Sequence, residues 1–160
     1  MTTAGVTGTA RRRTGSAGMV PQAGGGPYDA VMAVFLDHTI LEVTDLAQSV
    51  AFYRDVVGLE SRGRSGSFEV MLITPDLALD LWERPEPVSR HLALGMDRAT
   101  FEATFERIRA SGISYGDGPS TPTSMRGPGR SSGVHGDTDS VYFHDPSGHI
   151  LEILTYDDPS

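Results

Sequence analysis

The sequence predicts an α+β domain built from two similar units, each with a strand, a helix and three further strands in the order βαβββ. A strand-like run with a histidine near its start leads to a helix cap and a glycine stop twice, over 20 residues from His38 to Gly58 and over 21 from His91 to Gly112. Three short strand candidates follow the first helix, and a hairpin closes the second half. Such a repeat suggests two units packed about a pseudo-twofold axis, neither of which buries its sheet face alone.

In the first unit, residues 33–43 form a β-rich run in which alternate side chains share one face: Leu36, His38, Ile40 and Glu42. Thr44 and Asp45 offer a helix cap, and apolar residues then recur at helical spacing until Gly58. Three strands are expected at 60–64, 68–74 and 77–82, separated by Gly and Pro-Asp turn signals. A linker of proline and charged residues, 83–88, closes this unit.

The second unit starts with a strand at 90–96, a cap at Asp97 and a helix that stops at Gly112. Residues 115–139 are rich in Gly, Pro, Ser and Thr, and a loop of that length is a lid or a disordered insertion. Residues 140–154 then form a hairpin, because a Pro-Ser-Gly turn separates two apolar runs. The domain is predicted to span 30–160, with module one at about 33–83 and module two at about 89–157.

Residues 1–29 contain almost no large apolar side chain and are expected to be a disordered tail. The arginine triplet at 11–13 is not followed by the apolar run of a signal peptide, which favours a cytoplasmic protein. Translation is hypothesised to begin at Met19 or Met32, which mass spectrometry of the native N-terminus would test.

Composition excludes several kinds of site. The 160 residues suit one domain, and the absence of cysteine leaves imidazole and carboxylate as the ligands for any metal. No lysine is present, which excludes Schiff-base chemistry. The formal net charge is −8, and because residues 1–29 contribute +2, the remainder carries −10. Such a domain repels nucleic acid and anionic membranes, so a small-molecule partner is expected.

One carboxylate in the closing hairpin lies where an apolar side chain is expected. Glu152 stands between Leu151 and Ile153, and an unpaired buried carboxylate is costly unless it is paired or binds a metal. The alternative is an edge strand whose polar face lies in water. His38 and His91 occupy equivalent places in the two units, and although a lone strand histidine is usually structural, two histidines and a carboxylate suit a divalent metal.

Three stretches resemble the vicinal oxygen chelate superfamily, which includes glyoxalase I, extradiol dioxygenases, fosfomycin-resistance enzymes and bleomycin-resistance proteins. They are LDHTILEVTDLAQSVAFYRDVVGLE (36–60), HLALGM (91–96) and SVYFHDPSGHILEI (140–153). The resemblance implies two βαβββ modules that form an eight-stranded open cup (the glyoxalase/bleomycin resistance/dioxygenase fold), and a homodimer. It also implies one divalent metal, Fe(II), Mn(II), Ni(II), Co(II) or Zn(II), held by His38, His91 and Glu152.

The activities within this superfamily match only in part. Glyoxalase I has a fourth ligand, a glutamate, where this chain has the shorter Asp80. Fosfomycin-resistance enzymes are similar at Ser140 and Tyr142, but a family threonine near the epoxide is replaced by Ile40. Extradiol dioxygenases share the metal triad and the tyrosine at Tyr142, and their pattern suggests His135 as a substrate-contacting residue.

These matches predict a metal-dependent enzyme acting on a small, oxygen-rich substrate that chelates the metal, dioxygenase-like or glyoxalase/lyase-like. Tyr142, His135 and Asp80 are the candidate catalytic residues, and the candidate substrate-binding residues are Ser140, Arg126, Arg130 and Trp82. The arginines would pair with an anionic group if the long loop closes. The alternatives are a fosfomycin-type thiol transferase for antibiotic resistance and a non-catalytic, bleomycin-type drug-binding protein, whose relatives lack the triad.

Overall fold

The computed structural model of the protein describes Met1 and residues 34–156. The chain divides into two units, Met1–Phe35 and Leu36–Ser160, and the helices and strands of the described residues all lie in the second. The predicted tail and the candidate starts at Met19 and Met32 fall, apart from Met1, outside the described residues. No helix in the described part of the chain is long and apolar enough to cross a membrane.

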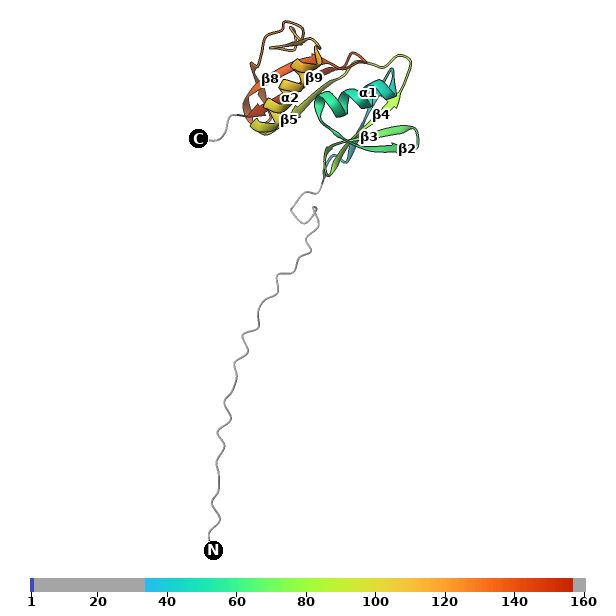
Figure 1. The fold of residues 1–160 in the computed structure, drawn as a ribbon, viewed down its shortest axis with the longest axis vertical. Helices are drawn as coiled ribbons and strands as arrows, with labels where there is room; N and C mark the ends of the chain where they lie inside the picture. The colour runs from blue at the N-terminus through green and yellow to red at the C-terminus, as the bar shows by residue number, and fades with distance from the viewer. Residues whose placement is uncertain (2–33, 157–160) are drawn as a thin grey trace. The chain divides into compact units, whose positions relative to one another are not determined.

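Module one follows the predicted order of strand, helix and three strands (Figure 1). Its four-stranded sheet has the order β1-β4-β3-β2, in which β1 runs parallel to β4 and the other pairs are antiparallel. Its elements are β1 (His38–Val43), α1 (Leu46–Phe52), the π-helix η1 (Tyr53–Val57), β2 (Glu60–Ser65), β3 (Phe68–Thr74) and β4 (Leu77–Glu83).

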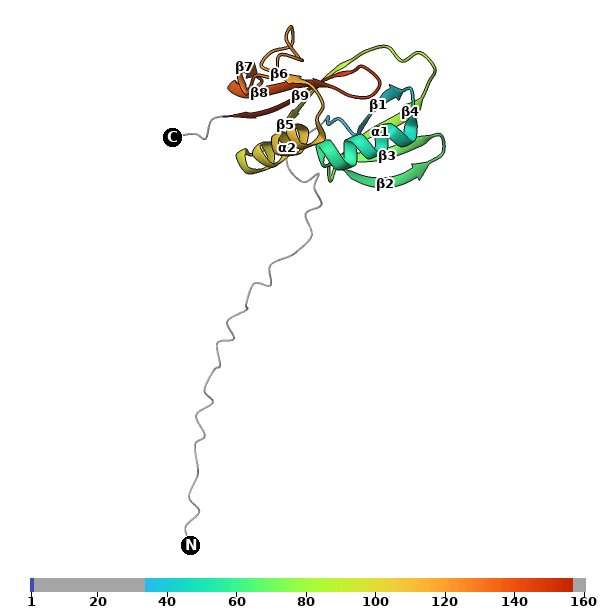
Figure 2. The same ribbon diagram turned by 45° about the horizontal axis from the view of Figure 1, so that its top comes forward.

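Module two repeats this plan with an interrupted edge strand (Figure 2). Its sheet has the order β5-β9-β8-β6, with β5 parallel to β9, and β7 also pairs with β8. Its elements are β5 (His91–Gly95), α2 (Arg98–Ser111), β6 (Tyr115–Gly116), β7 (Gly129–Gly133), β8 (Gly136–His144) and β9 (Ile150–Tyr156). The α+β class and the two βαβββ modules are therefore confirmed.

The edge strand of module two is interrupted, and the segment expected as a long loop differs from the prediction. β6 pairs with Tyr142 and Phe143, and β7 pairs with residues 136–140 of the same strand, so the two are pieces of one edge strand. The described residues thus hold nine strand segments in two sheets, and β6 and β7 together take the place of one of the eight predicted strands. The prediction of a lid or disordered insertion over 115–139 was wrong for β6, β7 and the start of β8, because Gly and Ser residues with weak strand preference are held there by pairing.

Each sheet has a face that packs on a helix and a face that does not. The buried core lies between the helices and the first of these faces, and it includes Leu41, Leu81, Phe101, Phe143 and Ile153. Side chains alternate along a strand, so the neighbours of these residues point to the opposite side, which we call the open face. By this alternation His38 points away from Leu41, three residues further along β1, and Glu152 points away from its neighbour Ile153, so both lie on the open faces of their sheets.

The predicted helix ends are confirmed, with one change in between. The side chain of Asp45 accepts from the N–H of Gln48, and that of Asp97 accepts from the N–H of Thr100. Gly58 ends the first helix in a left-handed conformation with φ of 92°. The helix expected as one α-helix over 46–57 widens into a π-helix after Phe52, where the N–H of Gly58 bonds to the carbonyl of Tyr53.

The β8–β9 turn, residues 145–149, joins the two modules. Asp145 is buried and accepts a 2.9 Å hydrogen bond from the hydroxyl of Tyr53 on η1. His149 is fully buried, and its Nε2 donates to the carbonyl of Glu42 at 2.6 Å while its Nδ1 accepts from the N–H of Arg90 at 3.1 Å. The turn therefore bonds to β1, η1 and the residue before β5, and it fixes the modules against each other.

Candidate functional site

The open face of module two brings together a predicted ligand pair and the predicted tyrosine. Glu152 on β9 pairs in register with Ala93 on one side and with Tyr142 on the other. Nε2 of His91 lies 3.1 Å from Oε2 of Glu152, and the hydroxyl of Tyr142 donates to Oε1 at 2.8 Å. Both oxygens of this carboxylate are therefore engaged by named side chains.

Burial distinguishes the two interpretations of Glu152. Its side chain is only 7% exposed, and β9 lies between β5 and β8 in the interior of the sheet. An edge strand with its polar face in water is therefore the wrong interpretation. Burial, together with the neighbouring Glu152 carboxylate, raises the pKa of the Tyr142 phenol, so this hydroxyl keeps its proton at neutral pH.

The distance between the two candidate ligand atoms fits a shared metal. Nitrogen and oxygen ligands at about 2.1 Å from one ion lie about 3.0–3.4 Å from each other at tetrahedral or octahedral angles. The 3.1 Å between His91 Nε2 and Glu152 Oε2 falls in this range. The donor set of imidazole and carboxylate suits Fe, Mn, Co, Ni and Zn.

The third predicted ligand lies on the open face of module one. His38 is at the start of β1, and its Nδ1 is 2.8 Å from a carboxylate oxygen of Asp37. This hydrogen bond, followed by the charges of Asp80 and Asp37, raises the pKa of His38. A histidine that donates one ring N–H to a carboxylate presents its other nitrogen, here Nε2, as the ligand.

The three predicted ligands do not form one group within the chain. Among the described residues, no cluster of three or more His, Cys, Asp or Glu side chains could hold a metal ion. His91 and Glu152 belong to the second sheet, whereas His38 and Asp80 belong to the first. Each module therefore carries part of the predicted ligand set on its own open face.

The open face of module one also carries large apolar side chains. Trp82 and Phe68 lie in register across β3 and β4, with ring centroids 5.9 Å apart, and neither is part of the core in the described residues. The guanidinium of Arg84 lies 3.2 Å from the centroid of the Trp82 ring. Ile40 is 49% exposed on the same face. Trp82 is therefore not part of the core, and its role in lining a site stays a prediction.

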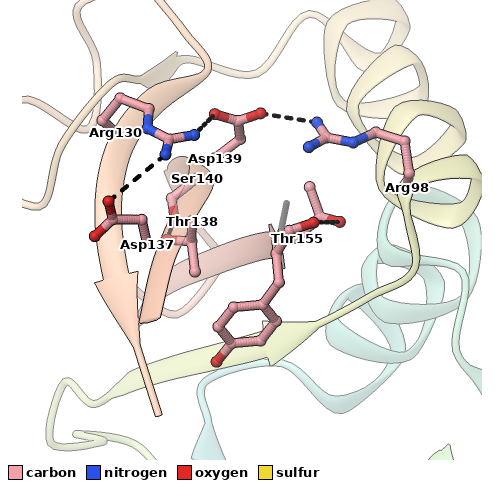
Figure 3. Close-up of polar contacts among 8 residues, drawn as sticks. Arg98, Arg130, Asp137, Thr138, Asp139, Ser140 and Thr155 are labelled. Atoms are coloured by element: carbon pink, nitrogen blue, oxygen red, sulfur yellow. Dashed lines mark hydrogen bonds and ion pairs between the residues drawn. The ribbon is translucent and has the colours of Figure 1, made fainter. Parts of the chain in front are cut away.

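The predicted arginines form ion pairs with nearby carboxylates. Arg130 contacts Asp139 at 2.9 Å and Asp137 at 3.8 Å, and Asp139 also pairs with Arg98 of α2 at 2.8 Å (Figure 3). The hydrogen bonds from Arg98 and Arg130 lower the pKa of Asp139. By alternation along β7 and β8, this group lies on the helix side of the sheet, opposite to Tyr142.

The other two loop residues of the prediction also lie apart from the ligand pair. Arg126 lies 3.1 Å from Asp117 within the excursion between β6 and β7. His135, at the tip of the β7–β8 hairpin, packs its ring against Tyr156 with centroids 5.2 Å apart. The structure thus does not bring Arg126, Arg130 or His135 to Glu152.

Several hydroxyl groups also lie on the open face of module two. Ser140 is fully buried, and its hydroxyl lies 2.9 Å from that of Thr138 (Figure 3). The hydroxyl of Ser131 on β7 lies 3.0 Å from that of Tyr142. Sequence reasoning missed Ser131 because it lies in the segment that was expected to be a loop. It also missed Asp37, whose place directly before His38 was an available signal.

Comparison with known proteins places this geometry in context. Residues 35–153 match the Glyoxalase/Bleomycin resistance protein/Dioxygenase superfamily. A solved structure named Oxidase ChaP-H2 is 33% identical, covers 81% of this chain and 98% of its own, and superposes with a TM-score of 0.66. Virulence protein STM3117 of Salmonella typhimurium is 27% identical over 130 residues, 76% of this chain and 83% of that protein.

A more distant structure shares the fold. Lactoylglutathione lyase from Agrobacterium tumefaciens is 22% identical, with 78% of this chain and 95% of that chain covered and a TM-score of 0.54. The named relatives of this chain thus include an oxidase, a virulence protein and a lyase.

Proposed function

Because the chain belongs to the Glyoxalase/Bleomycin resistance protein/Dioxygenase superfamily, we propose that it is a divalent-metal-dependent enzyme acting on a small, oxygen-rich substrate. The observation that carries this proposal is the pair of the exposed His91 and the buried Glu152, whose facing atoms lie 3.1 Å apart on the open face of module two. Within the chain this carboxylate already has Tyr142 and His91 as partners. The imidazole and carboxylate that face each other here are the donor types that suit a divalent first-row metal.

The proposed metal site is completed by a second copy of the chain. His38 lies on the other sheet, so a single chain supplies two of the three ligands at one place. In a two-fold symmetric dimer, module one of each subunit faces module two of its partner, and two equivalent sites result. Each site then combines His91 and Glu152 with the partner subunit's His38.

An oxygen-using reaction is the favoured chemistry. When bound, a divalent metal held by two histidines and one carboxylate supplies open positions for substrate oxygens and for dioxygen. Tyr142 holds the carboxylate of Glu152 in place and keeps its own proton at neutral pH. The 33% identity to Oxidase ChaP-H2 over 81% of this chain supports an oxidase or a dioxygenase-like enzyme.

A glyoxalase-like reaction is the second candidate. Asp80 lies on the open face of module one, two residues beyond Ala78, which is in register with His38, and its charge contributes to the raised pKa of that histidine. A carboxylate at this place corresponds to the fourth ligand of glyoxalase I, although aspartate is shorter by one methylene. The glyoxalase-like reaction would require Asp80 as a fourth metal ligand, and the oxygen-using reaction would not.

The proposal is tested on purified protein loaded with Fe(II), Mn(II), Co(II), Ni(II) or Zn(II). We expect one metal per chain, an increased melting temperature, and oxygen consumption with a catechol in the Fe(II) or Mn(II) form. Isomerisation of glutathionyl hemithioacetal instead of oxygen consumption would support the glyoxalase alternative. Absence of stoichiometric metal in the wild type, together with tight binding of bleomycin, would contradict the enzyme proposal and favour a drug-binding protein.

A further inference from the structure

A chain of hydrogen bonds leads from the edge strand β7 to the candidate ligands. The hydroxyl of Ser131 lies 3.0 Å from that of Tyr142, which in turn donates to Oε1 of Glu152 at 2.8 Å. Oε2 of the same carboxylate faces Nε2 of His91 at 3.1 Å. The chain of hydrogen bonds crosses four strands, β7, β8, β9 and β5, and all of its members lie on one sheet face.

The number of protons determines the direction of each hydrogen bond. An ionised carboxylate only accepts hydrogen bonds, and a phenol has a single proton to donate. Because the phenol of Tyr142 uses its single O–H in the hydrogen bond to Glu152, Ser131 must be the donor in the contact between the hydroxyls of Ser131 and Tyr142. The phenol oxygen then accepts from Ser131 and donates to Oε1, which fixes the rotation of its O–H bond.

We propose that Ser131 is a positioning residue for the metal-binding carboxylate. By donating to Tyr142, it directs the phenol proton to Oε1 of Glu152, which leaves Oε2 beside His91 as the atom that meets the metal. This inference rests on the proposed function, because it assigns Ser131 to the same site. Outer hydrogen-bond partners of metal ligands typically change metal affinity by about 10- to 100-fold.

The placement of β7 explains how Ser131 reaches this position. Ser131 pairs in register with Thr138, four residues before Tyr142 on β8, and the long tyrosine side chain spans this distance. Ser132, the next residue on the strand, is exposed and by alternation points to the other side. Ser132 therefore offers a matched control on the same strand with the same side chain.

The test compares Co(II) binding by the wild type, Ser131→Ala, Ser132→Ala and Ser131→Thr, using calorimetry and the visible Co(II) spectrum. We expect Ser131→Ala to weaken Co(II) binding by about tenfold and to alter the spectrum. Ser132→Ala should match the wild type, and Ser131→Thr should restore binding because it keeps the hydroxyl. Melting temperatures of the metal-free proteins control for loss of folding.

A double-mutant cycle with Tyr142→Phe tests the assigned route. If Ser131 acts through the phenol, Ser131→Ala causes no further loss of affinity once the hydroxyl of Tyr142 is gone. Independent losses in the double variant, or equal affinity of Ser131→Ala and Ser132→Ala, would overturn the inference while the proposed function stands. A wild type that binds no Co(II) would overturn both.

Discussion

The candidate site consists of single side chains on the open faces of the two sheets. The period of two along a strand was enough to put His38 on the same side as Ile40, whereas the contact of Tyr142 with Glu152 depends on the register between β8 and β9. The partners of these residues were harder to predict. Ser131 depends on the pairing of β7 with β8, and a Gly-Ser segment gives no periodic signal for such a strand.

At this scale, we predict that Asp37→Asn changes the properties of His38. The hydrogen bond to Asp37 is the largest cause of the raised pKa of His38, so its loss should lower that pKa toward the ordinary value of about 6.5. NMR titration of the imidazole measures this shift. We also expect about tenfold weaker metal binding, because the carboxylate orients the ring.

Asp76→Asn, in the β3–β4 turn, is the control for this loss of charge. It should leave both the titration of His38 and the metal affinity unchanged. An unchanged pKa of His38 in Asp37→Asn would show that the hydrogen bond between the two residues contributes nothing.

At the scale of elements, the helix boundaries could be predicted from the sequence, but the contacts between the two modules could not. Local signals mark both helix starts, at Asp45 and Asp97, and both helix ends, at Gly58 and Gly112. The π-helix and the role of the β8–β9 turn depend on contacts between distant segments. Tyr53 meets Asp145 across 92 positions of the chain, and no local pattern indicates such a contact.

His149→Ala should destabilise the protein by about 2–3 kcal/mol, because it leaves two buried backbone groups without their partner and opens a cavity. These groups are the carbonyl of Glu42 and the N–H of Arg90. Urea denaturation measures the free energy of unfolding. His144→Ala, at the exposed end of the same hairpin, should change it by about 0.5 kcal/mol or less. Equal effects of the two substitutions would contradict the role given to His149.

A second prediction concerns the contact between the two helices. A Cβ atom added at Gly58 would lie 2.5 Å from Nη2 of Arg107, whose guanidinium donates to the carbonyls of Val56 and Val57. Gly58→Ala should therefore cost more than the roughly 1 kcal/mol expected from its left-handed backbone alone.

Gly112→Ala provides the matched control, because Gly112 also ends a helix with a positive φ, of 74°, and has nothing within 4 Å of the added atom. We expect the melting temperature to fall further for Gly58→Ala than for Gly112→Ala. Equal decreases would show that the close approach of Arg107 has no energetic consequence.

At the scale of the whole molecule, the predicted ligands are divided between two sheets, and the β8–β9 turn holds the two modules against each other. His38 and Glu152 belong to different sheets through the pairing of their own strands, and the β8–β9 turn and Arg107 bond to module one across the boundary between the modules. The sequence predicts the repeat, because each half carries its own strand, cap and stop. It does not reveal whether a module meets its own partner module or that of a second chain, because both arrangements satisfy the same hydrophobic pattern.

The most direct test of this account mixes two inactive variants, His38→Ala and Glu152→Ala, after each has been purified and shown to bind no metal. In a dimer with shared sites, each mixed dimer contains one intact site, made of His38 from one subunit and His91 with Glu152 from the other. After subunit exchange, we expect metal binding at about a quarter of the wild-type sites, the statistical share in a two-fold symmetric dimer. Mixtures that exchange subunits but bind no metal would contradict the shared site.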